Sequence, residues 1–277
     1  TDKDGDQHGN SVTFQINGAD DSGNVSVNAG SGSDAGKVYE HGVLVNDASK
    51  TTTGSVTVSA TDGIKDVSIG GTTHTSADWV GKSITTTDGS TLTVTSVTTN
   101  ANGSVTLNYS YTLNSAQSND QGANNASVND TIGVTVSGQG GSSANGNIVI
   151  TIVDDTPLAN SINAGTLTED AAQNTLSGSI APAAANGNSF GADGAAATGA
   201  TGWGSVSAKL GTTTVNLSDY GKLTQNVDGS WKFELDNSKP ATQALNNGQS
   251  ITVTMGYTLT DKDGDQHGNS VTFQING

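Results

Sequence analysis

Hydrophobic and polar residues alternate in short runs along most of the chain. A period of two places successive side chains on opposite faces, as in a half-buried β-strand. The clearest runs are Ser55 to Ala60, Leu92 to Val97, Val105 to Leu113, Ile132 to Val136 and Ile148 to Val153.

The dipeptides between these runs favour tight turns. Asp62-Gly63, Asp88-Gly89 and Asn102-Gly103 each stand between two runs, and such pairs are typical of β-hairpins. About seven short strands per module, separated by turns, predict an all-β fold of tandem immunoglobulin-like β-sandwich modules. A β-solenoid is the alternative for a repetitive glycine- and aspartate-rich chain, but its nonapeptide repeat is absent.

The remaining sequence carries weaker signals. Val38, Val43 and Val45 predict another strand. We interpret three stretches of low complexity as surface loops: Ser22 to Gly36, Gly138 to Gly146 and Ala181 to Gly202.

One stretch occurs twice. Residues 1–18 and 260–277 both read TDKDGDQHGNSVTFQING, so the chain is interpreted as a window of a tandem array. Polar breaks occur at Asp20-Asp21 and at Asp154-Asp155, which Pro157 follows. We therefore expect residues 1–18 to be the terminal loop and strand of a preceding module, and residues 19–155 and 156–277 to form two modules.

Composition narrows the possible partners. The chain has no cysteine, and its formal net charge is −16. Without disulfides, a small extracellular module often depends on bound metal. The negative charge disfavours nucleic acid and attracts divalent cations. No apolar run reaches membrane-spanning length, so we expect no membrane insertion in this segment.

Catalytic patterns are missing from the sequence. The four histidines show no paired metal-binding spacing, and no Gly-x-Ser-x-Gly motif occurs. A sugar-cleaving site would need aromatic platforms, whereas Trp79, Trp203 and Trp231 lie within strand patterns and are expected in the cores. The chain is therefore predicted not to be an enzyme.

Aspartates at alternate positions form the first candidate metal site. Asp261, Asp263 and Asp265 are broken by Gly264, and such a loop can direct several oxygens at Ca²⁺, which takes six to eight. The first copy of the repeat carries the same pattern at Asp2, Asp4 and Asp6. The alternative interpretation is a hairpin loop solvated by water.

A second acidic set lies at the module boundaries. It comprises the pairs Asp20-Asp21 and Asp154-Asp155, and a glutamate near the first strand of each module, Glu40 and Glu169. In a seven-strand sandwich the first strand runs down, the sixth up and the seventh down. The loop between the last two strands therefore lies at the N-terminal pole of its module. Asp261, Asp263 and Asp265 should then face Asp154 and Asp155, with Glu40 approaching from the other side. The alternative is that linkers are acidic only because they are exposed.

The order of these motifs resembles a known family. Tyr257 to Asp265 reads YTLTDKDGD, the strand VTFQI follows, and an Asp-Asp break precedes VYEHG or LTED. This order is similar to the extender repeats of giant RTX-type adhesins of Gram-negative bacteria, also called bacterial Ig-like, cadherin-like or VCBS-type repeats. The resemblance covers essentially the whole chain. One departure follows Leu113, where Asn114 to Asp120 lacks the alternating aspartates.

The resemblance implies a secreted, calcium-rigidified stalk on the bacterial surface that projects distal ligand-binding domains for cell adhesion and biofilm formation. The partners would be neighbouring repeats of the same chain, with ligand contacts on other domains. The residues carried over as Ca²⁺ ligands are Asp20, Asp21, Glu40, Asp154, Asp155, Glu169, Asp261, Asp263 and Asp265. The alternative function is a carbohydrate- or surface-binding adhesive module.

Overall fold

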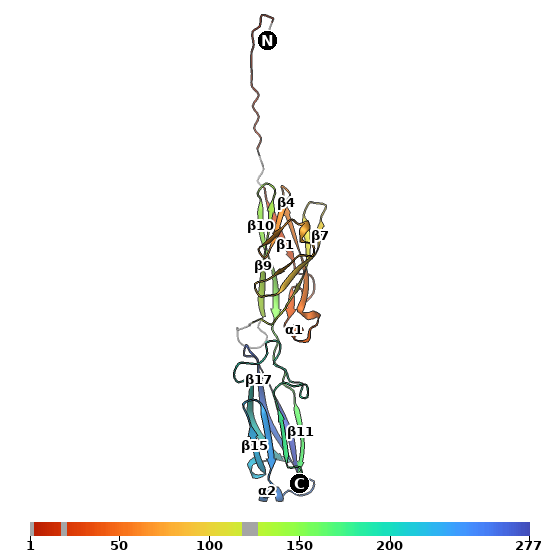
Figure 1. The fold of residues 1–277 in the computed structure, drawn as a ribbon, viewed down its shortest axis with the longest axis vertical. Helices are drawn as coiled ribbons and strands as arrows, with labels where there is room; N and C mark the ends of the chain where they lie inside the picture. The colour runs from red at the N-terminus through yellow and green to blue at the C-terminus, as the bar shows by residue number, and fades with distance from the viewer. Residues whose placement is uncertain (1–2, 18–20, 118–126) are drawn as a thin grey trace.

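The chain folds into two β-sandwiches that lie end to end along one axis (Figure 1). The computed structural model describes residues 3–17, 21–117 and 127–277. Strands dominate both sandwiches, and the helices are single short turns. The predicted all-β fold of immunoglobulin-like modules is confirmed.

The first sandwich has two five-stranded sheets. One sheet contains, in spatial order, β1 (Gly23–Asn28), β3 (Thr51–Ala60), β8 (Val105–Thr112), β7 (Thr91–Thr99) and β6 (Ser83–Thr85). The other contains β2 (Lys37–Tyr39), β10 (Ser143–Val153), β9 (Ser127–Gly138), β4 (Ile64–Ile69) and β5 (Thr72–His74). The short helices of this module are α1 (His41–Val45), η1 (Ala48–Lys50) and η2 (Ala77–Trp79).

The second sandwich has one five-stranded and one three-stranded sheet. The larger sheet contains β11 (Ile162–Thr168), β18 (Gln266–Asn276), β17 (Ser250–Thr260), β13 (Thr201–Leu210) and β14 (Thr213–Val215). The smaller one contains β12 (Thr175–Ser179), β16 (Ser230–Leu235) and β15 (Gly221–Gln225). Its helices are η3 (Leu217–Asp219) and α2 (Pro240–Gln243).

Alternation of side chains builds each core between its two sheets. On β10, Ile148, Ile150 and Ile152 are fully buried, whereas Val149 between them is exposed. Burial of such a side chain contributes about 1.5–3 kcal/mol. Trp79 and Trp231 lie in the two cores, as the sequence predicted.

Some expectations about individual elements differ from the structure. The described residues form ten strands in the first module, where about seven were expected, and eight in the second, which is close to the expected number. Gly23–Asn28, expected in a loop, is strand β1, because Val25 and Val27 pack against the core. Val43 and Val45, expected in a strand, lie in helix α1. The helix begins after Glu40, whose backbone carbonyl oxygen accepts a hydrogen bond from the Val43 amide.

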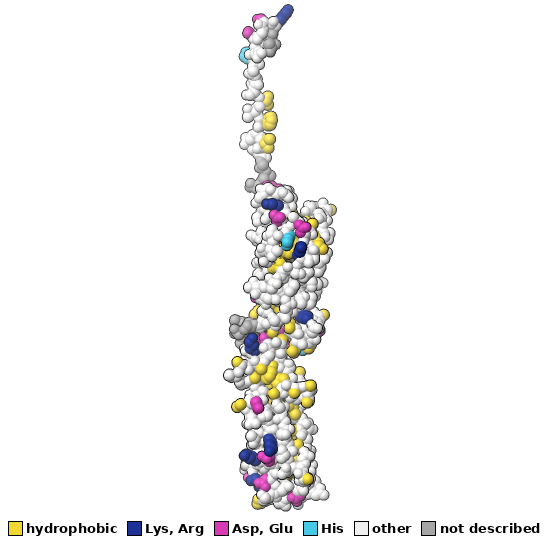
Figure 2. Space-filling view, in the orientation of Figure 1, with side chains coloured by type: hydrophobic (Ala, Val, Ile, Leu, Met, Phe, Trp, Pro, Cys, Tyr) yellow, Lys and Arg dark blue, Asp and Glu magenta, His cyan; other side chains and the backbone are white. Residues whose placement is uncertain are grey.

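The two copies of the repeated stretch differ in structure. Residues 266–276 form β18, which pairs with β11 on one side and β17 on the other. Residues 3–17 extend away from the first sandwich with Val12, Phe14 and Ile16 exposed (Figure 2). The same sequence is therefore a core strand only where its module surrounds it.

None of the helices in the described part of the chain is long and apolar enough to cross a membrane.

Candidate metal centre

Glu40 is held at the lower end of the first module by the backbone. It follows β2 directly, and its amide donates to the carbonyl oxygen of Val153, at the end of the neighbouring β10, at 3.0 Å. The side chain has no exposed surface. Its Oε1 accepts from the Gln117 amide at 2.8 Å, while the buried Oε2 has no hydrogen-bond partner among the described residues.

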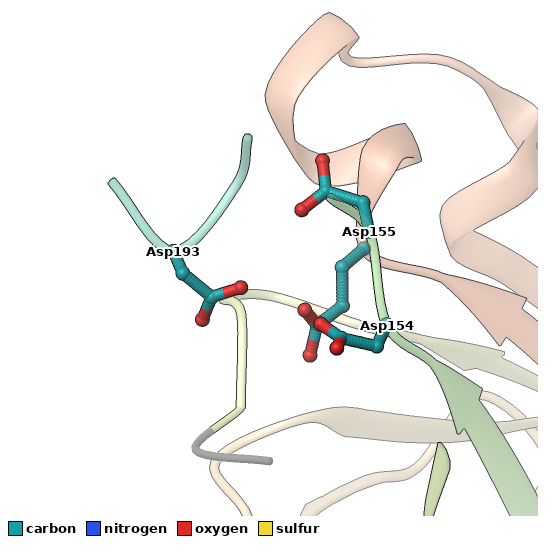
Figure 3. Close-up of side chains that lie close together, drawn as sticks. Asp154, Asp155 and Asp193 are labelled. Carbon is teal, nitrogen blue, oxygen red and sulfur yellow. The ribbon is translucent and has the colours of Figure 1, made fainter. Parts of the chain in front are cut away.

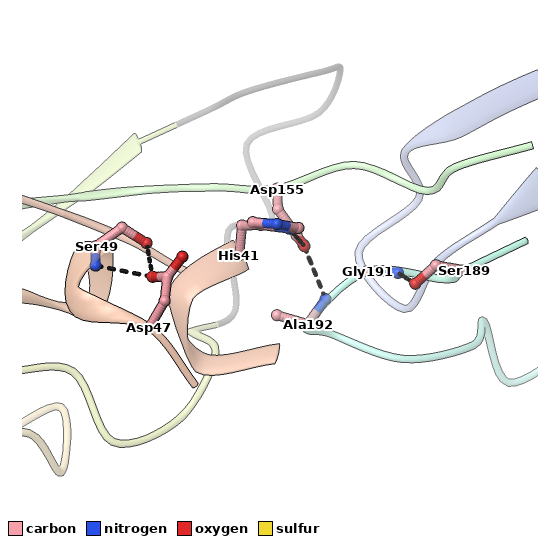
Figure 4. A network of polar contacts seen from close by, with 7 residues as sticks. All are labelled: His41, Asp47, Ser49, Asp155, Ser189, Gly191 and Ala192. Atoms are coloured by element: carbon pink, nitrogen blue, oxygen red, sulfur yellow. Dashed lines mark hydrogen bonds and ion pairs between the residues drawn. The ribbon is translucent and has the colours of Figure 1, made fainter. Parts of the chain in front are cut away.

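Asp154 and Asp155 continue the chain from β10 into the second module. Both are buried, with exposed fractions of 5% and 9%. Asp155 accepts from the amide of Ala192, a residue of the second module, with N to Oδ distances of 2.9 and 3.0 Å (Figure 4). The His41 Nδ1 lies 3.9 Å from Asp155 Oδ2. Asp155 therefore joins the two modules by its side chain.

Asp193 completes the group from the second module. It lies in the loop between β12 and β13, and its side chain points toward Asp154 (Figure 3). One carboxylate oxygen from each of Glu40, Asp154, Asp155 and Asp193 can be chosen so that all four lie within 4.8 Å of one another. We call these four residues the junction cluster.

The loop between β17 and β18 lies beside this cluster. Asp261 is fully buried, and its Oδ1 accepts from the amides of Gly264 and Asp265 at 3.1 and 2.7 Å. Gly264 has φ +105°, which favours glycine. We call residues 261–265 the aspartate loop. A cavity of about 220 Å³ between the modules is lined by Gln117 of the first and by Asp193, Lys262 and Asp263 of the second, among others.

Burial and mutual repulsion make these carboxylates difficult to ionise. Burial, more than the nearby Asp193 and Asp154, raises the pKa of Glu40 to about 9. Burial and Asp263 raise the pKa of Asp154 to about 7 and that of Asp193 to about 6. Burial and Asp263 also raise the pKa of Asp261 to about 8. Without a counter-ion, these carboxyl groups therefore retain their protons to higher pH than exposed carboxyl groups do.

These residues fit a hard divalent cation. Buried charges in proteins are normally paired or coordinate a metal, yet Glu40 Oε2, Asp154 Oδ1 and Asp193 Oδ2 are buried without hydrogen-bond partners in the described structure. Carboxylate oxygens are the ligands that Ca²⁺ prefers. The residues that would hold the ion come from both modules.

The other candidate residues lie apart from this centre. Asp4 and Asp6 are exposed on the N-terminal stretch, and Asp2 and Asp20 fall outside the described residues. Asp21 is at the opposite pole of the first module, close to Gly140. A Cβ atom added to Gly140 would lie 2.6 Å from the Asp21 Oδ2. Glu169 follows β11 at the far pole of the second module. The candidate set is therefore distributed over several places.

Glu169 occupies in the second module the position that Glu40 occupies in the first. Its amide donates to the carbonyl oxygen of Asn276, at the end of β18, at 2.9 Å. Its Oε2 is buried and has no partner among the residues described.

Asp193 is the member of the junction cluster that the sequence did not predict. It lies in a low-complexity stretch that was interpreted as a surface loop. The available signal was that Asp193 is the only acidic residue between Asp170 and Asp219.

Comparisons with known proteins give structural likenesses only. No protein-family model and no curated protein matches the chain. Among solved structures, extracellular cadherin domains 3–6 of protocadherin gamma B2 match 92% of this chain and 50% of theirs, at 15% identity and a TM-score of 0.30. A Ca²⁺-stabilised adhesin that helps an Antarctic bacterium reach out and bind ice matches 92% of this chain and 49% of its own, at 18% identity and a TM-score of 0.24.

A third match is to the N-terminal eight immunoglobulin domains of Down syndrome cell adhesion molecule. It covers 82% of this chain and 22% of that one, at 10% identity and a TM-score of 0.20. This chain thus spans half or less of the length of these three structures. Likenesses at such TM-scores do not indicate a function.

Proposed function

We propose that the chain is a segment of an extracellular stalk in a bacterial surface adhesin, in which calcium stiffens the joint between consecutive modules. The observation that carries this proposal is the junction cluster. Glu40 and Asp154 belong to the first module, Asp193 belongs to the second, and Asp155 contacts both. A cation bound by all four would tie the modules together.

The mechanism is mechanical. Without cation, those carboxylates at the joint that have lost their protons repel one another, and this repulsion favours separation of the modules. With calcium, the modules share ligands, and the joint is held in one orientation. Binding to the folded state alone also stabilises it, by about 2.7 kcal/mol when the free calcium concentration is about 100 times Kd.

A stalk requires a repeated, elongated and chemically simple unit. The two sandwiches lie along one axis (Figure 1), and the repeated eighteen residues favour a copied spacer. The RTX-type family, secretion, a role in biofilm formation and non-enzymatic action are part of this proposal. The neighbouring repeats of the same chain are its proposed partners.

The test measures thermal unfolding and small-angle X-ray scattering in calcium and in excess chelator. We expect calcium to raise Tm by several degrees and to increase the maximum dimension toward that of a straight two-module rod. The double variant Asp154→Asn/Asp155→Asn should lose the increase in length while both modules stay folded.

The control removes two charges elsewhere, in Asp66→Asn/Asp219→Asn, and should behave like the unaltered chain. If neither Tm nor the maximum dimension of the unaltered chain responds to calcium, the stalk mechanism is wrong. A screen of neutral glycans would then address the alternative adhesive module.

A further inference from the structure

Buried oxygens without hydrogen-bond partners occur in two groups at the joint. The first group belongs to the junction cluster: Glu40 Oε2, Asp154 Oδ1 and Asp193 Oδ2. The second belongs to the aspartate loop: Asp261 Oδ2 and Asp263 Oδ1. Among the described residues, the set within 4.8 Å contains four side chains, and Asp261 is not one of them. A cation bound to Asp261 would therefore be a different ion from the one in the cluster.

The number of charges also exceeds what one ion can offset. The junction cluster has four carboxylates, and Asp261 and Asp263 add two more. Burial raises the pKa of Asp193 and of Asp155, and the basic neighbours Lys262 and His41, respectively, offset only part of that rise. A single divalent cation would offset the charge of two carboxylates, so the other four would have to keep protons or remain charged at a largely buried site, which is costly.

The two groups are physically connected through the loop that carries Asp193. The Lys262 amide donates to the Gly194 carbonyl oxygen at 3.0 Å, and the Ala196 amide donates to that of Thr260 at 3.2 Å. Ala195 and Asp261 form an isolated antiparallel bridge. The aspartate loop therefore holds the chain that directly follows Asp193, the ligand that the second module contributes to the junction cluster.

We propose that the joint binds two calcium ions in a fixed order. A loop ion is held within the second module by Asp261 and Asp263. It fixes the aspartate loop, and through it Asp193, so that a junction ion can be shared by the four residues of the cluster. This inference rests on the proposed function, because it concerns calcium at the same joint.

The order follows from the origin of the ligands. Asp261 and Asp263 are two residues apart in one loop, so the loop ion requires no alignment of the modules. The junction ion requires Asp193 to be placed against residues of the first module. Loss of the loop ion should remove both ions, whereas loss of the junction ion should leave the loop ion bound.

The test counts bound calcium by equilibrium dialysis and isothermal titration for the full chain and three isosteric variants. Asp219→Asn, an exposed position on η3, is the control and should bind as many ions as the unaltered chain. Glu40→Gln should bind one ion fewer than the control. Asp261→Asn should bind two fewer, since the junction ion depends on the loop ion.

Equal losses in Glu40→Gln and Asp261→Asn would overturn the proposal, as would an Asp261→Asn variant that binds like the control. If circular dichroism shows that Asp261→Asn does not fold, the half-buried Asp263→Asn variant takes its place under the same criteria. The proposed function fails separately, if the length of the unaltered chain does not respond to calcium.

Discussion

Glu40 shows what the joint requires of a single residue. Its carboxyl group has no exposed surface, one oxygen accepts from an amide, and the other has no partner in the described structure. A glutamate in an unfolded chain titrates near pH 4.3, whereas burial raises the pKa of Glu40 in the folded chain to about 9. The folded state therefore binds this proton more tightly than the unfolded state.

Stability without calcium should consequently fall as pH rises. A folded pKa above the unfolded value contributes stability that is fully present below the unfolded pKa and lost as pH passes the folded one. The folded values are about 6 for Asp193, about 7 for Asp154 and about 9 for Glu40. In chelator, we expect Tm to decrease steadily from about pH 4 to about pH 9.

Two controls accompany this prediction. Glu40→Gln should flatten the upper part of the decrease, because the group with the highest pKa is removed. Saturating calcium should abolish the decrease, because the ion favours the deprotonated ligands. A Tm in chelator that is constant or rises over this range would contradict the prediction.

Local patterns in the sequence predicted most of the candidate ligands but missed Asp193, which belongs to no motif. Asp261 and Asp263 alternate around a glycine loop, and Asp154 and Asp155 follow a strand. Asp193 stands in a stretch of alanine and glycine, so it is neither one of several alternating aspartates nor placed at the end of a strand. It becomes a candidate because its loop pairs with the aspartate loop through Ala195 and Asp261, which are 261 − 195 = 66 positions apart, so no local pattern shows the contact.

At the scale of elements, the repeated stretch provides an internal comparison. Phe273 on β18 is 1% exposed and packs against Trp231 and Phe233, with ring centroids 6.0 and 5.0 Å apart. Phe14 occupies the same position in the first copy and is 77% exposed. The local sequence is identical, so only the surroundings differ.

Phe273→Ala should destabilise the second module by about 3–5 kcal/mol, because it removes buried surface and leaves a cavity. The matched variant Phe14→Ala should change the free energy of unfolding by no more than about 0.5 kcal/mol. Urea unfolding followed by tryptophan fluorescence measures both. Equal effects would show that residues 3–17 are packed in solution.

The same contrast explains which elements the sequence predicted. β18 and β10 have long alternating runs, so their strands and buried faces could be predicted. β1 has only Val25 and Val27 within a stretch of glycine, serine and asparagine, and it forms because it pairs along its whole length with β3. Helix α1 contains the β-branched Val43 and Val45, but the turn after Glu40 determines its conformation.

At the scale of the whole molecule, the two modules are joined both by the polypeptide chain that runs between them and by side chains around it. Asp154 and Asp155 connect β10 to the second module, and the cluster surrounds that connection (Figure 3). We therefore expect the orientation of one module on the other to depend on the charge state of a few carboxylates. The sandwiches themselves have separate cores.

The pairing of strands near each module's ends determines how the chain would carry a load. β2 pairs in parallel with β10 over three residue pairs, and β11 pairs in parallel with β18. When the two ends of the second module are pulled apart, β11 and β18 must slide past each other. Their hydrogen bonds are then loaded together in shear, whereas an antiparallel hairpin pulled at its open end breaks them one at a time.

The second module should therefore resist tension much better than its modest hydrophobic content suggests. Pulling single molecules by their two ends should give a higher unfolding force than pulling the same module through residues 250 and 276, which lie opposite each other on the antiparallel pair β17 and β18. Similar forces in the two directions would show that the parallel pairing of β11 with β18 gives this molecule no mechanical advantage.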